Sequence, residues 1–437
     1  MTIRTTPDER PAQHESPPLR HPFAILKDRN FATFWLAALV SNTGGWISNL
    51  TVPFVLFQVT GSALWVGYFS VAAFVPALLL GPVGGLVADR FDRRRVLLVT
   101  QAGAAAAALA LWAIWQSGVR NPAVILIPVV FAGICQGFNL PSWQSFVHDL
   151  VARESLRSAV TLNSVQFNAA RAIGPLVGGI ILVTAGPAWS FLINFASFGF
   201  VVVALLLVRA KEPQEFHVSM RNPARQFLNA LQYIPTQPGI VIAIFGSVVV
   251  GMLGQPIFSL TVVLARSVYN VDEFHFGLLN VALGVGAILA VPLLSGAGGR
   301  FSLSRAVTVG MIGCGIGLTS LSMIHDFSWA VPLLILTGAS LILCLAGTNT
   351  AIQLIVRDTM RGRVLSIRQV AFMTAIPTGA LLGGLVSDWV GVQPFLLCCG
   401  IGMFVAVSVI SALPGRRLQR LNDPYDSSVA LAPAGSE

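Results

Sequence analysis

The stretch Leu86–Leu98, which reads Leu-Val-Ala-Asp-Arg-Phe-Asp-Arg-Arg-Arg-Val-Leu-Leu, decides the fold of this chain. It is a cluster of charge between two long apolar runs: no Asp, Glu, Lys or Arg lies between Asn30 and Ala88, or between Val96 and Val119. Hydrocarbon cannot solvate charge, so the runs are predicted to span a membrane and the cluster to be a loop at its surface. Four arginines in so short a loop predict that it is cytoplasmic, because cytoplasmic loops collect Lys and Arg.

The composition agrees with a membrane protein. The chain has 437 residues, of which 55% are hydrophobic and only 10% charged, whereas a soluble domain carries roughly 25% charged residues. A net charge of +9 can indicate nucleic-acid binding, but here the basic residues lie in short loops between apolar runs, which favours topology determinants. The cysteines lie inside apolar runs without metal-ligand spacing, so neither disulfides nor a metal site is expected: Cys135, Cys314, Cys344, Cys398 and Cys399.

Apolar segments bounded by charge or turn residues predict twelve spans, each meeting the ~20-residue length of a spanning helix. They cover residues 31–58, 63–88, 96–117, 122–148, 158–184, 188–208, 239–265, 275–298, 304–324, 329–350, 364–388 and 392–413. The fold class expected is therefore all-α integral membrane, with twelve transmembrane helices.

The predicted organisation follows from these spans. It comprises a disordered cytoplasmic N-tail (1–29), a six-helix bundle (30–209), a cytoplasmic linker (210–238), a second six-helix bundle (239–413) and a cytoplasmic C-tail (414–437). This topology places 24 of the 27 Lys and Arg residues on the cytoplasmic side. In the linker, Phe227, Leu228, Leu231 and Ile234 recur at helical spacing, which predicts either an amphipathic helix on the membrane surface or a plain linker helix.

The two halves also repeat. Gly174-x-x-x-Gly178-Gly179 corresponds to Gly379-x-x-x-Gly383-Gly384, and Arg90-Phe91 corresponds to Arg300-Phe301. Two matched bundles usually hold a substrate site between them at the middle of the bilayer.

On these residues the chain resembles the major facilitator superfamily of secondary transporters over nearly its whole length. Gly85-Leu-Val-Ala-Asp89-Arg90-Phe91-Asp92-Arg93-Arg94 is similar to that superfamily's loop between helices two and three, with Asp92 in place of the usual Gly. Phe91-Asp92-Arg93-Arg94 resembles the branch that contains enterobactin-type siderophore exporters and macrolide efflux pumps. Further matches to that branch are Gly61-Ser-Ala-Leu, Leu162-Asn163-Ser164 and Asn168-Ala-Ala-Arg171-Ala-Ile-Gly174-Pro175-Leu-Val-Gly178-Gly179.

The resemblance implies two pseudo-symmetric six-helix bundles and a conformational gate formed by Gly85, Asp89, Arg90, Arg93 and Asp149. It implies that Asp89 accepts from the free N–H groups that open helix eleven, and that Arg93 pairs with Asp149. The alternative is that the arginines only set the topology. Gly174, Pro175, Gly178 and Gly179 resemble the helix-five signature of exporters and antiporters, and small residues there would also serve simple close packing.

Arg171 is the only Lys, Arg, Asp or Glu that lies deep inside a predicted span, about thirteen residues from the cytoplasmic end of its helix and, at ~1.5 Å per residue, near the bilayer centre. A charge there is costly and should face the bundle interior. It either binds an anionic group of a substrate or is a structural arginine bonded to its neighbours. Because Arg keeps its proton, it cannot itself carry the coupling proton.

Other polar residues inside spans are candidate substrate contacts, although each is equally a candidate for packing between helices. They are Asn42, Asn163, Gln166, Asn168, Asn280 and Asn349. Spans one, four, seven and ten hold no acidic residue, so a proton relay would have to use Asp149, His148 or Asp388 at helix ends.

The favoured hypothesis is a proton-motive-force-driven exporter of a small organic solute, a siderophore or similar anionic or zwitterionic metabolite, in the bacterial inner membrane. The alternatives are a multidrug or macrolide efflux pump, and a membrane sensor or enzyme that does not transport. No catalytic residues, metal or cofactor are expected. The expected partners are the solute, protons and the lipid bilayer, with no nucleic acid, and the chain is expected to be a monomer.

Overall fold

A computed structural model describes residues 22–152, 155–208, 223–295, 302–357 and 360–412, together with Leu421. Most of these residues are helical, and none of them lies in a strand. Residues 1–21 of the predicted N-tail, residues 414–420 and 422–437 of the predicted C-tail, and the linker residues 209–222 lie outside the described residues. The predicted domain limits in those regions therefore stay predictions.

Six long helices precede the linker: α1 (Arg29–Thr60), α2 (Ala63–Arg90), α3 (Arg93–Gln116), α4 (Pro122–Leu150), α5 (Leu156–Thr184) and α6 (Pro187–Leu207). They form the first bundle. The second bundle begins with one interrupted run, in which α8 (Pro238–Val249) and α9 (Ile257–Val263) are each followed by a π-helical turn, η4 (Val250–Gly254) and η5 (Leu264–Val268). It continues with α10 (Glu273–Ser295), α11 (Leu303–Met323), α12 (Phe327–Ile355), α13 (Arg361–Val390) and α14 (Val392–Ala412).

The predicted all-α membrane fold is confirmed. Eleven helices of the described chain are long and apolar enough to cross a bilayer, the α8–η5 run counting as one. The twelfth long helix is α1, whose 32 residues include a polar series from Ser41 to Asn49 that lowers its hydropathy. Because α1 packs against α5 and α6, these polar residues lie among neighbouring helices.

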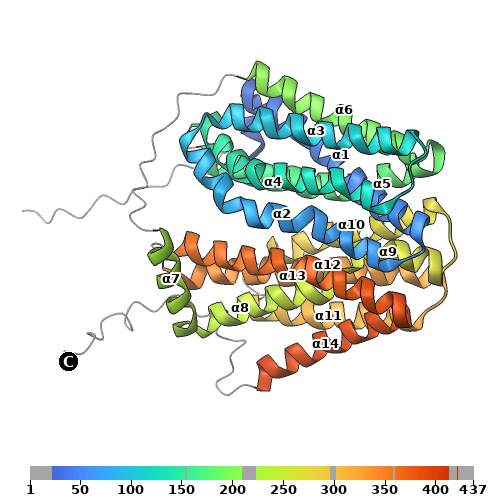
Figure 1. The fold of residues 1–437 in the computed structure, drawn as a ribbon. Coiled ribbons are helices and arrows are strands. Elements are labelled where there is room, and N and C mark those ends of the chain that lie inside the picture. The colour runs from blue at the N-terminus through green and yellow to red at the C-terminus, as the bar shows by residue number, and fades with distance from the viewer. Residues whose placement is uncertain are drawn as a thin grey trace, which may run out of the picture.

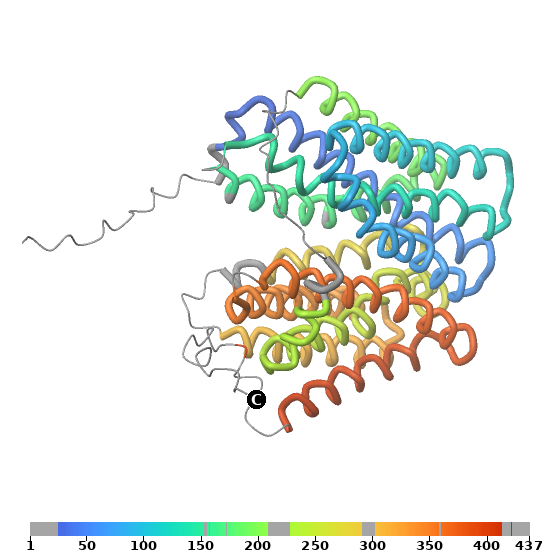
Figure 2. The backbone as a smooth tube through the Cα atoms, turned by 60° about the vertical axis from the view of Figure 1, so that its left-hand side comes forward, coloured from blue at the N-terminus to red at the C-terminus, as the bar shows by residue number. Residues whose placement is uncertain are grey.

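The helices lie side by side in two stacked bundles (Figures 1 and 2). In the first bundle α3 and α6 pack together on the side away from the second bundle, and α11 and α14 occupy the matching place in the second. Helices α2, α5, α10 and α13 lie between these outer pairs, where α2 contacts α13 and α5 contacts α10. The two bundles therefore meet through two crossed helix pairs.

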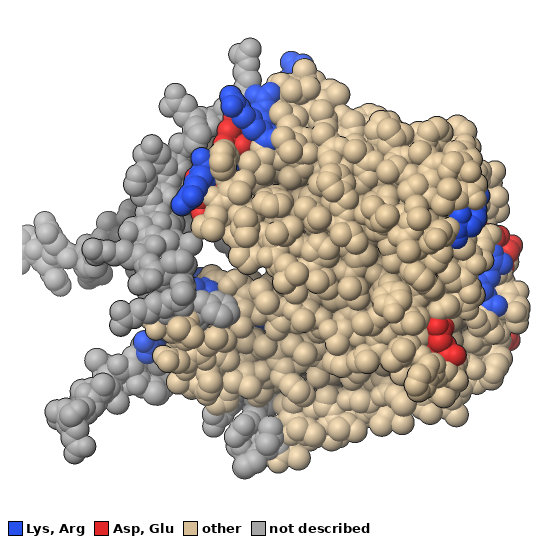
Figure 3. Space-filling view, in the orientation of Figure 1, with Lys and Arg blue, Asp and Glu red and all other residues tan. Residues whose placement is uncertain are grey.

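The molecule has two ends that differ in charge. We call the end that carries the Phe91–Arg95 loop the basic end, and the opposite end, where the Gly61 turn joins α1 to α2, the Gly61 end. Figure 3 shows a notch between the two bundles that opens toward the basic end. At the Gly61 end the bundles touch, as the contacts below describe.

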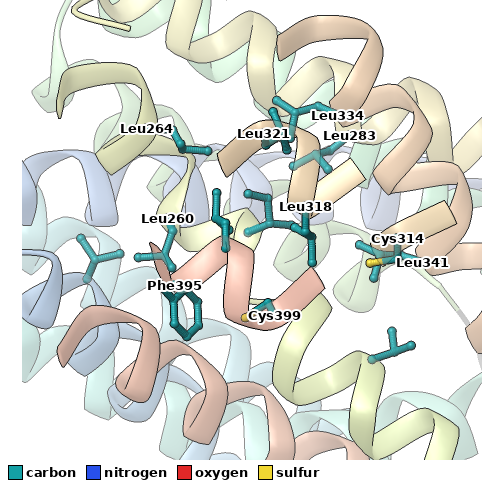
Figure 4. Close-up of a cluster of buried hydrophobic side chains, with 14 of the residues drawn as sticks. Leu260, Leu264, Leu283, Cys314, Leu318, Leu321, Leu334, Leu341, Phe395 and Cys399 are labelled. Carbon is teal, nitrogen blue, oxygen red and sulfur yellow. The ribbon is translucent and has the colours of Figure 1, made fainter. Parts of the chain in front are cut away.

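Apolar side chains form the cores. One cluster joins the Gly61 half of the first bundle, including Phe54, to most of the second bundle. Figure 4 shows part of it, where Leu283, Leu321 and Leu334 gather and Cys314 lies beside Leu341. A separate cluster, with Phe34 and others, fills the basic end of the first bundle alone. The apolar packing is therefore continuous between bundles only toward the Gly61 end.

Three short elements lie at the basic end, among them the 3₁₀ helix η3 (Ile234–Thr236), which links α7 (Pro223–Tyr233) to α8. Pro22–Lys27 forms the 3₁₀ helix η1, where a disordered tail to residue 29 was predicted; Ile25 and Leu26 pack against the core of the first bundle, which orders it. The linker contains α7, which contacts α13. Leu228 and Leu231 of α7 are exposed and Ala230 is buried.

Candidate transport site

The predicted gate is partly assembled in this conformation. Arg93, in the first turn of α3, donates from Nη1 to Asp149 Oδ1 at 2.6 Å, at the end of α4. Its Nε also donates to the carbonyl of Ala88, at 3.4 Å. The ion pair that the resemblance implies is therefore present, and it ties α3 to α4 within the first bundle. Its role in gating stays a prediction.

The rest of the gate points into open space. Asp89 and Arg90, at the end of α2, are exposed, and a Cβ atom built at Gly85 would meet no other atom within 4 Å. No hydrogen bond or ion pair joins Asp89 to a described residue. Its implied contact with the start of α13 is not made while the basic end is open.

Arg171 lies where the two bundles meet. Its guanidinium carbon is 5.4 Å from the ring centroid of Trp46 on α1 and 4.6 Å from that of Phe258 on α9, so each bundle supplies one aromatic neighbour. No hydrogen bond or ion pair joins this side chain to a described residue, and its buried Nε has no partner. A guanidinium in this position is held by aromatic rings and has donors left for an incoming acceptor.

A second arginine lies inside the membrane helices. Arg368, on α13, is 9% exposed, and it donates from Nη1 to Ser247 Oγ at 3.2 Å and from Nη2 to Asn349 Oδ1 at 3.1 Å. Arg368 is therefore a second buried charge among these helices, in the second turn of α13, and the sequence analysis did not single it out. Its place within the predicted span 364–388 was the available signal, but Arg361 and Arg363 nearby made it look like part of a cytoplasmic loop.

The predicted polar contacts fall into different settings. Asn163 accepts from Trp143 Nε1 at 3.2 Å, and Asn349 accepts from Arg368. Asn280 is buried and bonded to Thr261 Oγ1 at 3.1 Å, so it joins α10 to α9. The other three are Asn42, which is half-buried, Gln166, which is 1% exposed with an unpartnered Nε2, and Asn168, which is exposed and bonded to the carbonyl of Ser164. None of these contacts tests a role in substrate binding.

The helix-five motif serves two different contacts. Gly174 and Gly178 face α1, against Trp46 and Ile47, with Pro175 buried between them. Gly179 instead faces the other bundle: a Cβ atom there would lie 2.7 Å from Gly277 Cα on α10. The absence of side chains thus lets α5 and α10 cross backbone to backbone.

Aromatic and charged groups close the Gly61 end. The Phe54 ring on α1 stacks on Phe276 of α10, with centroids 5.5 Å apart, and the Arg266 guanidinium lies 5.3 Å from the Phe54 centroid. Arg266 also pairs with Glu273 at the start of α10. In the same loop, the backbone amide and ring of His275 donate to Asp272 and hold the pKa of that carboxyl below its usual range.

Known proteins resemble the chain along nearly its whole length. A family model described as transmembrane secretion effector matches residues 20–428. The staphyloferrin A transporter of Staphylococcus aureus is 24% identical over 400 residues, covering 88% of this chain and 96% of the relative. The enterobactin exporter EntS of Citrobacter koseri is 25% identical over 407 residues (90% and 94%). Macrolide efflux protein A of Streptococcus pyogenes is 21% identical over 390 residues (87% and 94%).

Solved transporter structures share the fold. The crystal structure of a bacterial homologue of the human lysosomal transporter Spinster matches with a TM-score of 0.71 at 13% identity, covering 88% of this chain and 96% of that chain. A D-xylose–proton symporter matches with a TM-score of 0.69 at 15% identity, covering 91% and 99%. At such identities the likeness extends to the architecture alone.

Proposed function

Since the chain belongs to the transmembrane secretion effector family, within the major facilitator superfamily, we propose that it is a secondary active exporter of a small anionic or zwitterionic organic solute, such as a siderophore. Transport proceeds by alternating access: the two bundles rock about a central site that faces first one side of the membrane and then the other. The relatives that carry siderophores support the solute class.

The observation that carries this proposal is the setting of Arg171. A charged group inside the bilayer is retained at a cost, and Arg368 shows how this chain accommodates one: its two Nη atoms donate to Ser247 and Asn349, and only its Nε is without a partner among the described residues. Arg171 has no such Nη partners among the described residues, and its buried Nε is likewise unpartnered. A carboxylate or similar anion entering from the notch would supply the missing acceptor, and Trp46 and Phe258 would flank it.

The orientation follows from the charges. The basic end, with Arg93, Arg94 and Arg95, faces the cytoplasm by the positive-inside rule, which places both termini there. The open notch then faces the cytoplasm, so the conformation described here is the one that loads solute for export across the inner membrane. The proton gradient drives the cycle, with the protein acting as a monomer, and proton binding falls to carboxylates at helix ends because Arg171 keeps its proton.

An efflux pump for macrolides or other drugs is the second candidate. The aromatic pair Trp46 and Phe258 offers flat apolar contact for a bulky solute, and a macrolide efflux protein is among the relatives. A membrane sensor or enzyme without transport is the third, and the two matched bundles argue against it, as does a family whose relatives transport.

The test is transport into everted membrane vesicles. Staphyloferrin A, enterobactin and a macrolide are supplied with and without an uncoupler, to the parent and to Arg171→Ala. We expect uptake of one of the anionic solutes to depend on the proton gradient. In Arg171→Ala its KM should rise about tenfold or more, the size of one or two lost charge-assisted hydrogen bonds.

Arg120→Ala is the matched control, because Arg120 also lies on an aromatic ring, 3.6 Å from the Trp115 centroid, but on the exposed surface of the Gly61 end. It should transport like the parent. Undiminished transport by Arg171→Ala contradicts anion binding at that residue, and faster transport of a cationic drug by this variant favours the second candidate.

A further inference from the structure

Two helix ends of this chain carry nearly the same sequence, identical at five of six positions. Residues 84–89 at the end of α2 read Gly-Gly-Leu-Val-Ala-Asp, and residues 383–388 at the end of α13 read Gly-Gly-Leu-Val-Ser-Asp. Since α2 ends at the basic end and α13 ends at the Gly61 end, the two copies lie at opposite ends of one crossed helix pair.

The copy on α13 makes a contact between the bundles. Asp388 accepts hydrogen bonds from the Oγ atom of Ser62, from the backbone N–H of Ala63 at 2.5 Å and from that of Leu64 at 3.3 Å. These groups open α2, and Ser62, at the N-cap position, makes no capping bond with its own side chain. A carboxylate at a helix N-terminus satisfies free N–H groups and complements the positive end of the helix dipole. Asp388 is therefore the cap of a helix in the other bundle.

Glycines bring the two backbones close enough for this cap. A Cβ atom at Gly384 would lie 2.9 Å from Leu64 Cα, and one at Gly67 would lie 2.9 Å from the carbonyl oxygen of Ala380. Asp388 lies one helical turn beyond Gly384, so the close crossing delivers its carboxylate to the first turn of α2.

The copy on α2 has the same parts without the contact. Gly85 corresponds to Gly384, and nothing lies within 4 Å of a Cβ atom built there. Asp89 corresponds to Asp388 and is exposed. The helix that it would meet, α13, begins at Arg361 with Met360 at the N-cap position, which provides no side-chain capping bond.

We propose that Asp388 is the latch of the Gly61 end and that it works in alternation with Asp89. When the Gly61 end is closed, Asp388 caps α2 and Asp89 is free, which is the state described here. When the basic end closes, Asp89 caps α13 and Asp388 is released. Asp388, at the end of α13, caps the start of α2, and Asp89, at the end of α2, caps the start of α13. Rocking α2 against α13 therefore breaks one of these caps as it forms the other. The proposal rests on alternating access, but not on the identity or charge of the solute.

The test measures opening of the Gly61 end without any solute. Ser70 on α2 is 1% exposed and its Oγ lies 3.2 Å from that of Ser259 across the bundle interface. A Ser70→Cys reporter, in a background with the five native cysteines replaced, is reacted with a water-soluble maleimide in nanodiscs. Asp388→Asn should label about fivefold faster than the parent, because the amide keeps only one of the two acceptor oxygens and loses the charge that complements the positive end of the α2 dipole. Asp89→Asn should label more slowly, and the double variant should return toward the parent rate.

Asp326→Asn is the matched control. Asp326 also caps a helix at the Gly61 end, accepting from the N–H of Ser328 at 2.9 Å, but within its own bundle. It should label at the parent rate. Asp388→Asn must also leave Cys314, retained as a single buried cysteine in a parallel sample, unreactive. The proposal is overturned if Asp388→Asn labels like the parent, if Asp326→Asn accelerates equally, if Asp89→Asn accelerates too, or if Cys314 becomes reactive. Since no solute is used, these outcomes are independent of whether Arg171 binds an anion.

Discussion

Arg171 and Arg368 have the same side chain in two different surroundings inside the membrane. Arg368 is bonded to Ser247 and Asn349 from two other helices of its bundle. Arg171 has aromatic neighbours from both bundles and no hydrogen bond to a described residue. Hydrogen bonding thus separates an arginine that holds helices together from one whose donors are available for a solute.

This difference predicts effects of different size on the free energy of unfolding. Arg368→Ala should destabilise the detergent-solubilised protein by about 2–3 kcal/mol, because it removes two charge-assisted hydrogen bonds and leaves the buried Ser247 and the half-buried Asn349 with fewer partners. Arg171→Ala should cost less, about 1 kcal/mol, since it removes two contacts with aromatic rings but no hydrogen bond to a described residue. Thermal unfolding followed by light scattering compares the two variants.

Arg363→Ala is the control on the same helix, because Arg363 is half-buried and its Nη1 contacts only the sulfur of Met360, at 3.3 Å, among the groups described. Its melting temperature should stay near that of the parent. A melting temperature that falls equally in Arg171→Ala and Arg368→Ala would contradict the assignment of different roles.

At the scale of elements, the two bundles close at the Gly61 end through two crossed helix pairs that use different chemistry. The α2–α13 pair combines glycine contacts with the Asp388 cap. The α5–α10 pair crosses where Gly179 meets Gly277, with no charged group at that contact, and the Phe54 ring stacks beside it on Phe276. Close crossing at both pairs requires residues without side chains.

Gly179→Ala should therefore open the Gly61 end. The new Cβ atom would lie 2.7 Å from Gly277 Cα, which is backbone and cannot turn aside, so α5 and α10 must separate. A clash of this kind costs about 1–3 kcal/mol, so labelling of the Ser70→Cys reporter should accelerate at least fivefold. Gly199→Ala on α6 is the control, since nothing lies within 4 Å of a Cβ atom there. Equal rates in the two variants would show that the Gly179 contact does not hold the end closed.

At the scale of the whole molecule, the spacing of charge was enough to predict the architecture. The uncharged runs on both sides of the Asp89–Arg95 loop predict membrane-spanning helices. Such runs can be recognised in the sequence without any information about how the helices pack. The Arg93–Asp149 pair was also anticipated, because its members recur in a loop signature that the chain resembles.

The remaining features depend on contacts between residues far apart in the sequence. Arg368 looks like a loop residue until Ser247, 121 positions away, is placed beside it. Asp388 lies 325 positions from Ala63, the amide that it caps. Asn280, a candidate solute contact, is bonded to Thr261, 19 positions away, and this bond joins α10 to α9. Sequence patterns give the type of each residue, and only packing gives its partner.

The rocking of two bundles about a central site is the claim on which the whole account depends. The test is to measure the distance between two spin labels by electron paramagnetic resonance, on protein in nanodiscs. One pair of labels is placed at the basic end, at Phe91 and Arg305, and a second pair at the Gly61 end, at Val119 and Met323. All four positions are exposed, and each pair joins the two bundles. Going from the parent to Asp388→Asn, the basic-end distance should shorten while the Gly61-end distance lengthens. Distances that lengthen together, or a basic-end distance that stays fixed while the Gly61 end opens, would contradict the account.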